Sequence, residues 1–163
     1  DRSPAFARFI DIDDPRFGGV VPDMPQEIRT YCDETGQPLP ENLGDVARCV
    51  YESLVMKLRE RVADMVRLSG GPLETLHVVG GGIQNEQLCQ WIADATGLTV
   101  VAGPVETTSV GNALVQMRAA GVVETLADAR NMSNSSFDLT HYTPSNGEAW
   151  DAAYAAYREV VSA

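Results

Sequence analysis

The sequence predicts an α/β fold in which a parallel sheet, only partly present, is flanked by helices. Two short β-branched runs alternate with amphipathic helical segments, the order typical of parallel strands joined by crossover helices. A glycine run follows the first strand, where many proteins bind a ligand between a strand and a helix. Two strands are few for a parallel sheet, so we expect the chain to be a fragment of a longer protein.

The charge composition indicates which classes of binding partner this chain is suited to. The chain has 163 residues, the size of one domain, with 12 basic and 23 acidic residues and a formal net charge of −11. This balance argues against nucleic acid and anionic membranes as partners. An anionic ligand would need main-chain N–H groups, a helix N-terminus or a metal ion to attract it. No run approaches the ~18 apolar residues of a membrane span, and we expect a cytoplasmic protein.

The first part of the chain, residues 1–44, is predicted to be an extended arm with one short helix. It holds six of the nine prolines. The helix starts at Pro25 and stops at Gly36. A long amphipathic helix then follows Asn42 and ends near Leu68, since apolar residues recur every four positions. These positions are Val46, Val50, Leu54, Leu58 and Val62.

Two buried strands are predicted next. The runs Thr75–Val79 and Leu98–Val101 are rich in β-branched residues and are bounded by proline or glycine. The helix between them closes at Gly97, where a left-handed residue is favoured. Its apolar positions are Leu88, Ile92 and Ala95.

Two further helices are predicted toward the C-terminus, with His141 in a polar loop between them. The first ends at Gly121. The second starts at a capping box formed by Ser145 and Glu148. Their apolar residues are Val110, Ala113, Leu114 and Met117 in the first, and Trp150, Ala153, Tyr154, Tyr157 and Val161 in the second.

The strongest chemical signal is the run Gly80, Gly81 and Gly82 between a strand and a helix. Residues without a Cβ atom let the main chain approach a ligand closely, and the next helix N-terminus would offer free N–H groups to a phosphate. A tight turn without a ligand remains the alternative. The run lacks the lysine of a Walker phosphate loop and the spacing of the dinucleotide fingerprint, so nicotinamide cofactors are not expected.

Other polar residues give weaker signals. The acidic run with Asp11, Asp13 and Asp14 fits a solvated turn better than a metal site. His77 alternates with apolar residues on a strand, which favours a hydrogen-bonded core histidine over a catalytic one. The segment Glu106–Thr108 reads as a helix cap, with contact to a ligand as the alternative.

Three cysteines, Cys32, Cys49 and Cys89, are too few and too widely spaced for a metal cluster. We expect small apolar core residues, and a bridge between Cys32 and Cys49 stays open as an alternative. No pattern typical of serine-histidine-aspartate or cysteine-histidine catalysis is present.

Several blocks, in this order, resemble the C-terminal domain of the FGGY carbohydrate kinases, and within that family the members that phosphorylate L-rhamnulose. The resemblance extends from about Phe9 to Val161, and the set of blocks is far more specific than the glycines alone. The blocks are Phe9–Phe17, Arg29–Pro38, Ala47–Cys49 with Glu52–Leu54, Val78–Asn85, Ala102–Glu106 and Gly111–Ala113.

This resemblance implies the C-terminal part, residues 45–163, of a nucleotide-binding domain with the actin-like, ribonuclease H-like ATPase fold. It implies ATP and Mg²⁺ as cofactors, and a ketose as partner, with transfer of the γ-phosphate to a sugar hydroxyl, for L-rhamnulose the 1-hydroxyl. Gly81 would contact the nucleotide most directly, with Gly80, Gly82 and Asn85 as its neighbours. The family's general base lies upstream, so no catalytic residue and no metal ligand is assigned to this chain, and an isolated fragment should self-associate.

Two other functions stay open. The parent could be an FGGY kinase for another sugar (xylulose, ribulose, fuculose or glycerol), since the residues that select the sugar lie upstream. The chain could also be a module that binds a nucleotide or a partner without catalysis.

Overall fold

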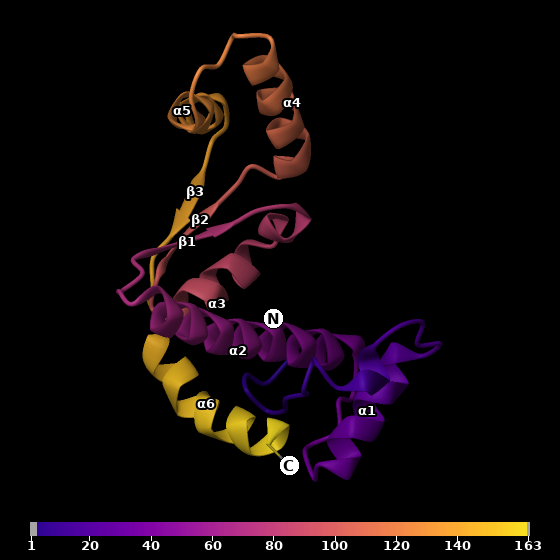
Figure 1. Cartoon of the computed structure of the whole chain (residues 1–163). Coiled ribbons are helices and arrows are strands. Elements are labelled where there is room, and N and C mark those ends of the chain that lie inside the picture. The colour runs from indigo at the N-terminus through magenta and orange to yellow at the C-terminus, as the bar shows by residue number, and fades with distance from the viewer. Residues whose placement is uncertain (1–2, 163) are drawn as a thin grey trace. The chain divides into compact units, whose positions relative to one another are not determined.

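The structure is a computed structural model that describes residues 3–162 (Figure 1). The chain divides into two compact units. One comprises residues 3–72, 94–96 and 146–162, and the other residues 73–93 and 97–145. No helix in the described part of the chain is long and apolar enough to cross a membrane.

The first unit is helical. Its long central helix, α2, begins after Asn42, as the sequence predicts, and the Asn42 side-chain oxygen accepts a hydrogen bond from the Asp45 N–H. It ends at Gly70, which has a φ of 73°. The elements of this unit are η1 (Pro15–Phe17), α1 (Met24–Glu34), α2 (Leu43–Ser69) and α6 (Gly147–Val161).

The irregular segment at residues 3–14, which contains turns at residues 5–6 and 12–13, is joined to the rest of this unit by hydrogen bonds between main-chain groups and side chains. The Phe6 N–H donates to the buried Glu52 carboxylate at 2.8 Å. Gln37 contacts Phe9 twice: its side-chain oxygen accepts from the Phe9 N–H at 2.7 Å, and its amide nitrogen donates to the Phe9 carbonyl at 2.8 Å. Residues 3–42 and α2 therefore share one core.

The helix α6 completes this core with its aromatic side chains. The ring of Trp150 meets that of Phe6 edge-on at 4.8 Å, and Tyr157 meets Phe9 at 5.7 Å. The predicted apolar face of the last helix is therefore confirmed. Its predicted capping box is wrong, because the helix begins at Gly147 with Asn146, not Ser145, in the capping position.

All three cysteines are free thiols and are buried. Cys32 and Cys49 belong to one core cluster with Ile10, Ile28 and Tyr31. A hydrogen bond between the two thiols lowers the pKa of Cys32 and, together with burial, raises that of Cys49. The prediction of small core residues is confirmed for all three.

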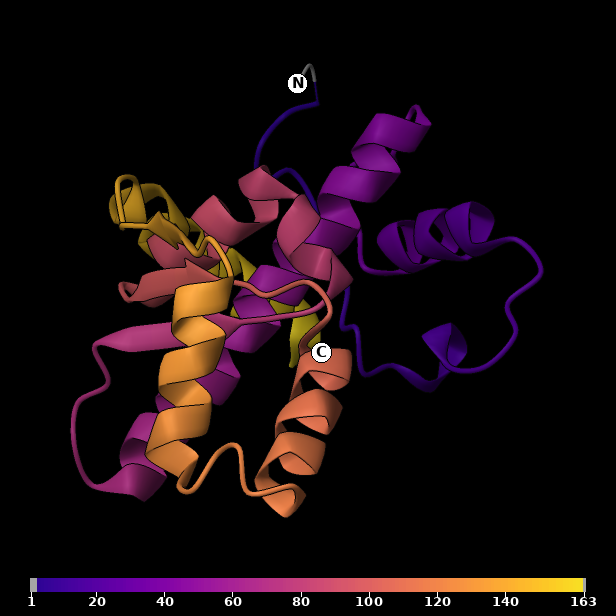
Figure 2. The same ribbon diagram turned by 90° about the horizontal axis from the view of Figure 1, so that it is seen from above.

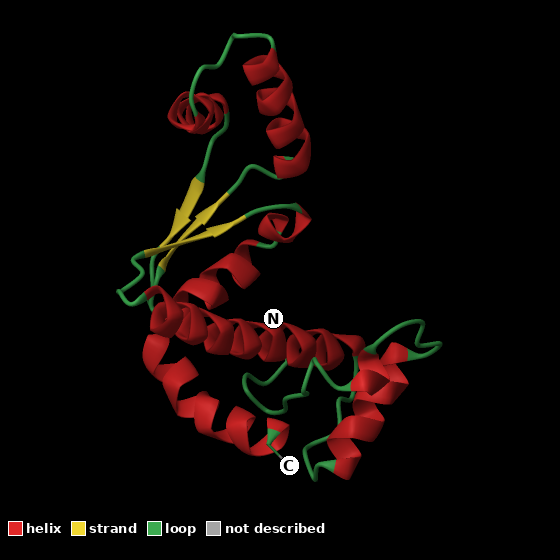
Figure 3. Ribbon diagram, viewed as in Figure 1, coloured by secondary structure: helices red, strands yellow, loops and turns green. Residues whose placement is uncertain are grey.

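The second unit contains a three-stranded sheet with the strand order β1-β2-β3 (Figure 3). The strands β1 and β2 are parallel, as predicted, and β3 adds to β2 in the antiparallel direction. The helices α4 and α5 are joined by the loop at residues 120–125 (Figure 2). The elements are β1 (Thr75–Val78), η2 (Gly81–Gln84), α3 (Glu86–Thr96, its last three residues counted with the first unit), β2 (Thr99–Ala102), α4 (Thr107–Ala119), α5 (Leu126–Ser136) and β3 (Thr140–Tyr142).

The helix α5 and the strand β3 of this unit were not predicted from the sequence. The helix α5 has few apolar residues and none that is buried, so it lacks the periodicity of a predictable helix. It starts with the capping box of Thr125 and Asp128, in which aspartate replaces the usual Glu or Gln. The strand β3 has three residues and includes His141, which was expected in a loop.

Candidate functional site

The glycine turn lies beside the turn that follows the second strand. The Gly103 N–H donates to the Val78 carbonyl at 3.0 Å, and the Gly80 N–H reaches the Pro104 carbonyl at 3.5 Å. Both turns therefore meet at the carboxyl end of the parallel pair β1 and β2. In open α/β sheets this is the end at which ligands bind.

Gly80 is required by the fold itself. Its φ of 85° and ψ of −171° place it in a region that is accessible almost only to glycine. The Ile83 N–H donates to the Gly80 carbonyl at 3.2 Å and closes the turn that follows. At this position the turn alone explains the glycine.

Gly81 and Gly82 are different, because nothing within the described chain requires them to be glycine. Their φ values lie outside the left-handed region, and a Cβ atom at either position would meet no other atom within 4 Å. Both residues are exposed, and no described residue accepts a hydrogen bond from their N–H groups. The turn thus presents two free N–H groups and open space where a ligand could approach.

Asn85 and the start of α3 differ from the arrangement expected for a helix that binds phosphate. The Asn85 side-chain oxygen accepts the Leu88 N–H at 3.1 Å, so the residue acts as the helix cap. Glu86 puts a negative charge in the first turn. The cap uses one N–H of the helix N-terminus and Glu86 opposes its positive end, so the amides of Gly81 and Gly82 are the stronger candidate donors.

A recess of about 260 Å³ adjoins the glycine turn. Gly103 is needed there, since its φ is +129° and a Cβ atom would lie 3.0 Å from Leu139 Cδ2. The sequence indicates part of this recess, since Glu106 was a possible ligand contact and the Gly103-Pro104 turn was a usable signal, but the residues after α5 gave none. The lining residues are Ile83, Gly103, Pro104, Val105, Glu106, Phe137 and Asp138.

Beneath the turn, the buried Cys89 thiol lies 3.8 Å from the Ile83 carbonyl oxygen, within the range of a weak hydrogen bond. Burial raises the pKa of this thiol, and the Glu86 carboxylate raises it further. Cys89 is fully buried, and these surroundings do not favour the thiolate that a nucleophile needs.

The segment that opens α4 acts as a turn. Glu106 occupies the capping position but makes no capping hydrogen bond through its side chain, so the expected cap is wrong in detail. The Thr107 hydroxyl instead donates to the Pro104 carbonyl at 2.5 Å. Thr107 therefore fixes the loop that carries the recess.

The remaining candidates lie elsewhere. Lys57 Nζ lies 2.8 Å from the Asp13 carboxylate and 3.4 Å from that of Asp11, and Asp14 pairs with Arg16 at 3.2 Å. These aspartates serve as ion-pair partners within the first unit. Within residues 3–162 no group of three or more His, Cys, Asp or Glu side chains could hold a metal ion.

His77 was expected in the core, and this is wrong: its side chain is exposed on β1. The strand lies at the edge of the described sheet, so only alternate residues are partly covered. The alternation of apolar residues was interpreted as burial on both faces, which requires neighbours that the described chain lacks.

Residues 3–120 match the FGGY family of carbohydrate kinases, C-terminal domain. The chain belongs to this family. The match includes the whole glycine turn and the recess apart from Phe137 and Asp138. The predicted family is therefore confirmed.

Relatives of the FGGY chain give a finer comparison. This chain is 42% identical over 161 residues to a rhamnulokinase of Bacteroides thetaiotaomicron. The aligned region covers 99% of this chain and 33% of that protein. It is 44% identical over 141 residues to a rhamnulokinase of Pectobacterium carotovorum, covering 86% and 28% of the two proteins. The chain thus spans about a third of the length of these relatives, and its predicted similarity to kinases of L-rhamnulose is confirmed.

Solved structures of sugar kinases share the fold. A gluconate kinase from Lactobacillus acidophilus has a TM-score of 0.61 at 14% identity and covers 77% of this chain and 26% of its own. A xylulose kinase from Rhodospirillum rubrum has a TM-score of 0.57 at 20% identity and covers 78% and 26%. The predicted fold class, a partial sheet of the sugar-kinase type with flanking helices, is confirmed.

Proposed function

We propose that these 163 residues form the C-terminal part of a rhamnulokinase, which transfers the γ-phosphate of ATP to the 1-hydroxyl of L-rhamnulose. The observation that carries the proposal is the 42% identity to a rhamnulokinase along 99% of the chain. The fold agrees, since it resembles other sugar kinases.

The described residues would contribute one wall of the ATP site. The free amides of Gly81 and Gly82 would donate to phosphate oxygens, which needs no lysine and suits a chain with a net charge of −11. The neighbouring recess, with Ile83 and Phe137 in its wall, would take a less charged part of the nucleotide. Glu106 and Asp138 also line it and would repel a phosphate.

The chemical step would depend on residues outside this chain. An upstream aspartate would accept the proton of the sugar hydroxyl, and the hydroxyl oxygen would attack the γ-phosphorus in line with the leaving ADP. We therefore expect the isolated chain to lack kinase activity, since it supplies neither the base nor the sugar pocket.

Magnesium would arrive with ATP. This cation commonly keeps several waters and binds through phosphate oxygens and one or two carboxylates, not through a dedicated protein cage. Bound magnesium would supply neutralisation of the phosphate charge.

The test is a coupled kinase assay on the intact gene product with L-rhamnulose, xylulose, ribulose, fuculose and glycerol as acceptors. We expect the highest kcat/KM with L-rhamnulose. A clear preference for another sugar would mean that the chain belongs to a kinase with a different substrate. Nucleotide binding without phosphate transfer would favour the non-catalytic module.

The role of Gly81 can be tested separately. In the intact enzyme, Gly81→Val should raise the KM for ATP at least about tenfold and leave the KM for the sugar unchanged, because its side chain would fill the space beside the two free amides. Gly71→Val is the matched control, since a Cβ atom at Gly71 also meets nothing within 4 Å. An unchanged KM for ATP in both variants would show that the glycine run is a tight turn that binds no ligand.

The same proposal includes a cytoplasmic location, which fits the three free thiols and the use of ATP. It also includes self-association of the chain when it is made alone, since β1 leaves an unpaired edge in the described sheet. The net charge of −11 favours a discrete dimer over a precipitate. Light scattering over a concentration series tests this, and a strict monomer would contradict it.

A further inference from the structure

The helices α4 and α5 carry apolar surface that nothing in the described chain covers. Neither helix has a buried residue. Val115 is 70% exposed, and Val122 and Leu126, at and after the loop between the helices, are 62% and 56% exposed. An apolar surface of this kind usually marks a contact with another part of a protein.

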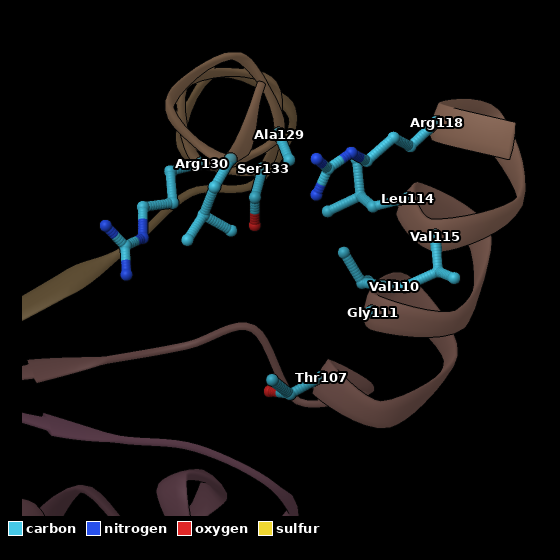
Figure 4. A pocket seen from close by; sticks show the side chains of 10 residues that line it. Thr107, Val110, Gly111, Leu114, Val115, Arg118, Ala129, Arg130 and Ser133 are labelled. Atoms are coloured by element: carbon cyan, nitrogen blue, oxygen red, sulfur yellow. The ribbon is translucent and has the colours of Figure 1, made fainter. Parts of the chain in front are cut away.

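A recess of about 320 Å³ lies between the two helices, larger than the one beside the glycine turn. Leu114 and Arg118 extend from α4 toward α5, and Ala129 and Ser133 face them from α5 (Figure 4). The walls are mainly aliphatic. The full lining is Thr107, Val110, Gly111, Leu114, Val115, Arg118, Leu126, Ala129, Arg130 and Ser133.

A second recess, of about 180 Å³, shows that the apolar surface continues around α4. Ala113 and Met117 line it from α4, opposite Met132 and Phe137. The residues of α4 that line neither recess form a mainly polar stripe, made of Thr108, Ser109, Asn112, Gln116 and Ala119. The helix thus has a mainly apolar face at the recesses and a polar face away from them, as a helix does when one face packs against another part of a protein.

The observations favour one occupant over a second copy of this chain. The two recesses share Val110, Leu114 and Ser133, so they form one continuous surface between α4 and α5. The relatives provide a larger candidate, because two thirds of the length of the Bacteroides protein has no counterpart in this chain.

We infer that the α4–α5 surface, defined as the residues lining the two recesses, is a docking surface for the polypeptide that precedes this chain in the longer kinase. The inference rests on the proposed function, since it takes the chain to be part of such a kinase. The docking segment should bring aliphatic side chains into the 320 Å³ recess and oxygen atoms to Arg118 and Arg130 at its wall.

Thiol labelling, with the labelled residue identified by mass spectrometry, tests the inference, because the three cysteines of this chain are buried. Val115→Cys should react quickly with a maleimide in the isolated 163 residues at submicromolar concentration. In the intact gene product it should react at least about tenfold more slowly. Gln116→Cys, on the polar stripe of the same helix, should react quickly in both proteins.

Each outcome of the labelling experiment supports or overturns the docking surface. A Val115→Cys that reacts equally fast in both proteins would overturn the inference. Protection that disappears when the intact protein is diluted would overturn it too, and would assign the surface to a second copy. Kinase activity of the same Val115→Cys sample is measured in parallel: protection without activity would sustain the docking surface and refute the proposed function, whereas activity without protection would do the reverse.

Discussion

The main-chain N–H of Ile10 donates to the buried hydroxyl oxygen of Ser53 at 2.9 Å. The same hydroxyl donates to the Cys49 carbonyl at 2.6 Å, so one side chain joins the N-terminal segment to α2. Ser53→Ala should lower the free energy of unfolding by about 1–3 kcal/mol, because it leaves the buried Ile10 N–H without an acceptor. Urea denaturation of the isolated chain measures this.

Ser135→Ala is the control for that experiment. The Ser135 hydroxyl is exposed and donates to the Met132 carbonyl one turn earlier, so its loss should change the free energy of unfolding by less than about 0.5 kcal/mol. Equal effects of the two substitutions would show that the Ile10 contact contributes nothing.

The glycine turn predicts opposite effects on stability at neighbouring positions. Gly80→Ala should destabilise the chain by about 1–3 kcal/mol, since alanine is strained at a φ of 85°. Gly81→Ala should be neutral or stabilise by up to about 1 kcal/mol, because it meets no atom and restricts the unfolded chain. Thermal unfolding followed by circular dichroism compares the two. A strong loss of stability in Gly81→Ala would mean that the fold, not a ligand, requires this glycine.

The pair of Asp13 and Lys57 gives the chain an acid-sensitive contribution. A hydrogen bond from Lys57 lowers the pKa of Asp13, with further contributions from its charge and that of Arg61. Because the folded-state pKa is the lower one, the contribution is present above the unfolded pKa of about 3.9 and is lost as the pH falls through the folded value.

Urea denaturation between about pH 5 and pH 2 should therefore show a smaller loss of stability for Asp13→Asn than for the wild type. Lys57→Met should have the same effect, and the double variant should add nothing further. Because Asp13 is exposed, 0.5 M salt should weaken the difference. Identical pH profiles for the wild type and Asp13→Asn would contradict the assignment.

The buried thiols predict a large contrast in reactivity. Cys32, Cys49 and Cys89 are 0%, 1% and 0% exposed, so a thiol reagent should modify none of them quickly in the native chain. After denaturation without reductant, all three should react, since all are free. A count of one would reveal a bridge between Cys32 and Cys49, the alternative left open by the sequence.

The sequence predicts the elements that carry an apolar face or a clear end signal. The long helix after Asn42 and the helix that stops at Gly97 are found within one or two residues of their predicted bounds. The helix α5 could not be predicted in this way, because it buries no residue within the described chain. Strand β3 is too short for its pattern to be read.

The candidate site was only partly predictable. The residue order shows three glycines after a strand, but it cannot tell which of them is needed for its φ and which leaves open space. That distinction between Gly80 and Gly81 needs coordinates. Likewise, Phe137 and Asp138 come from a distant part of the chain and reach the recess only through the fold.

The uncovered surface of α4 and α5 has a consequence for the chain in a living cell. Val115, Val122 and Leu126 together present aliphatic side chains of the kind that chaperones and quality-control proteases bind. A cell that made only these 163 residues should degrade them faster than a longer polypeptide that covers α4 and α5, even if both folded equally well. Abundance in the cell would then report whether the rest of the polypeptide is attached.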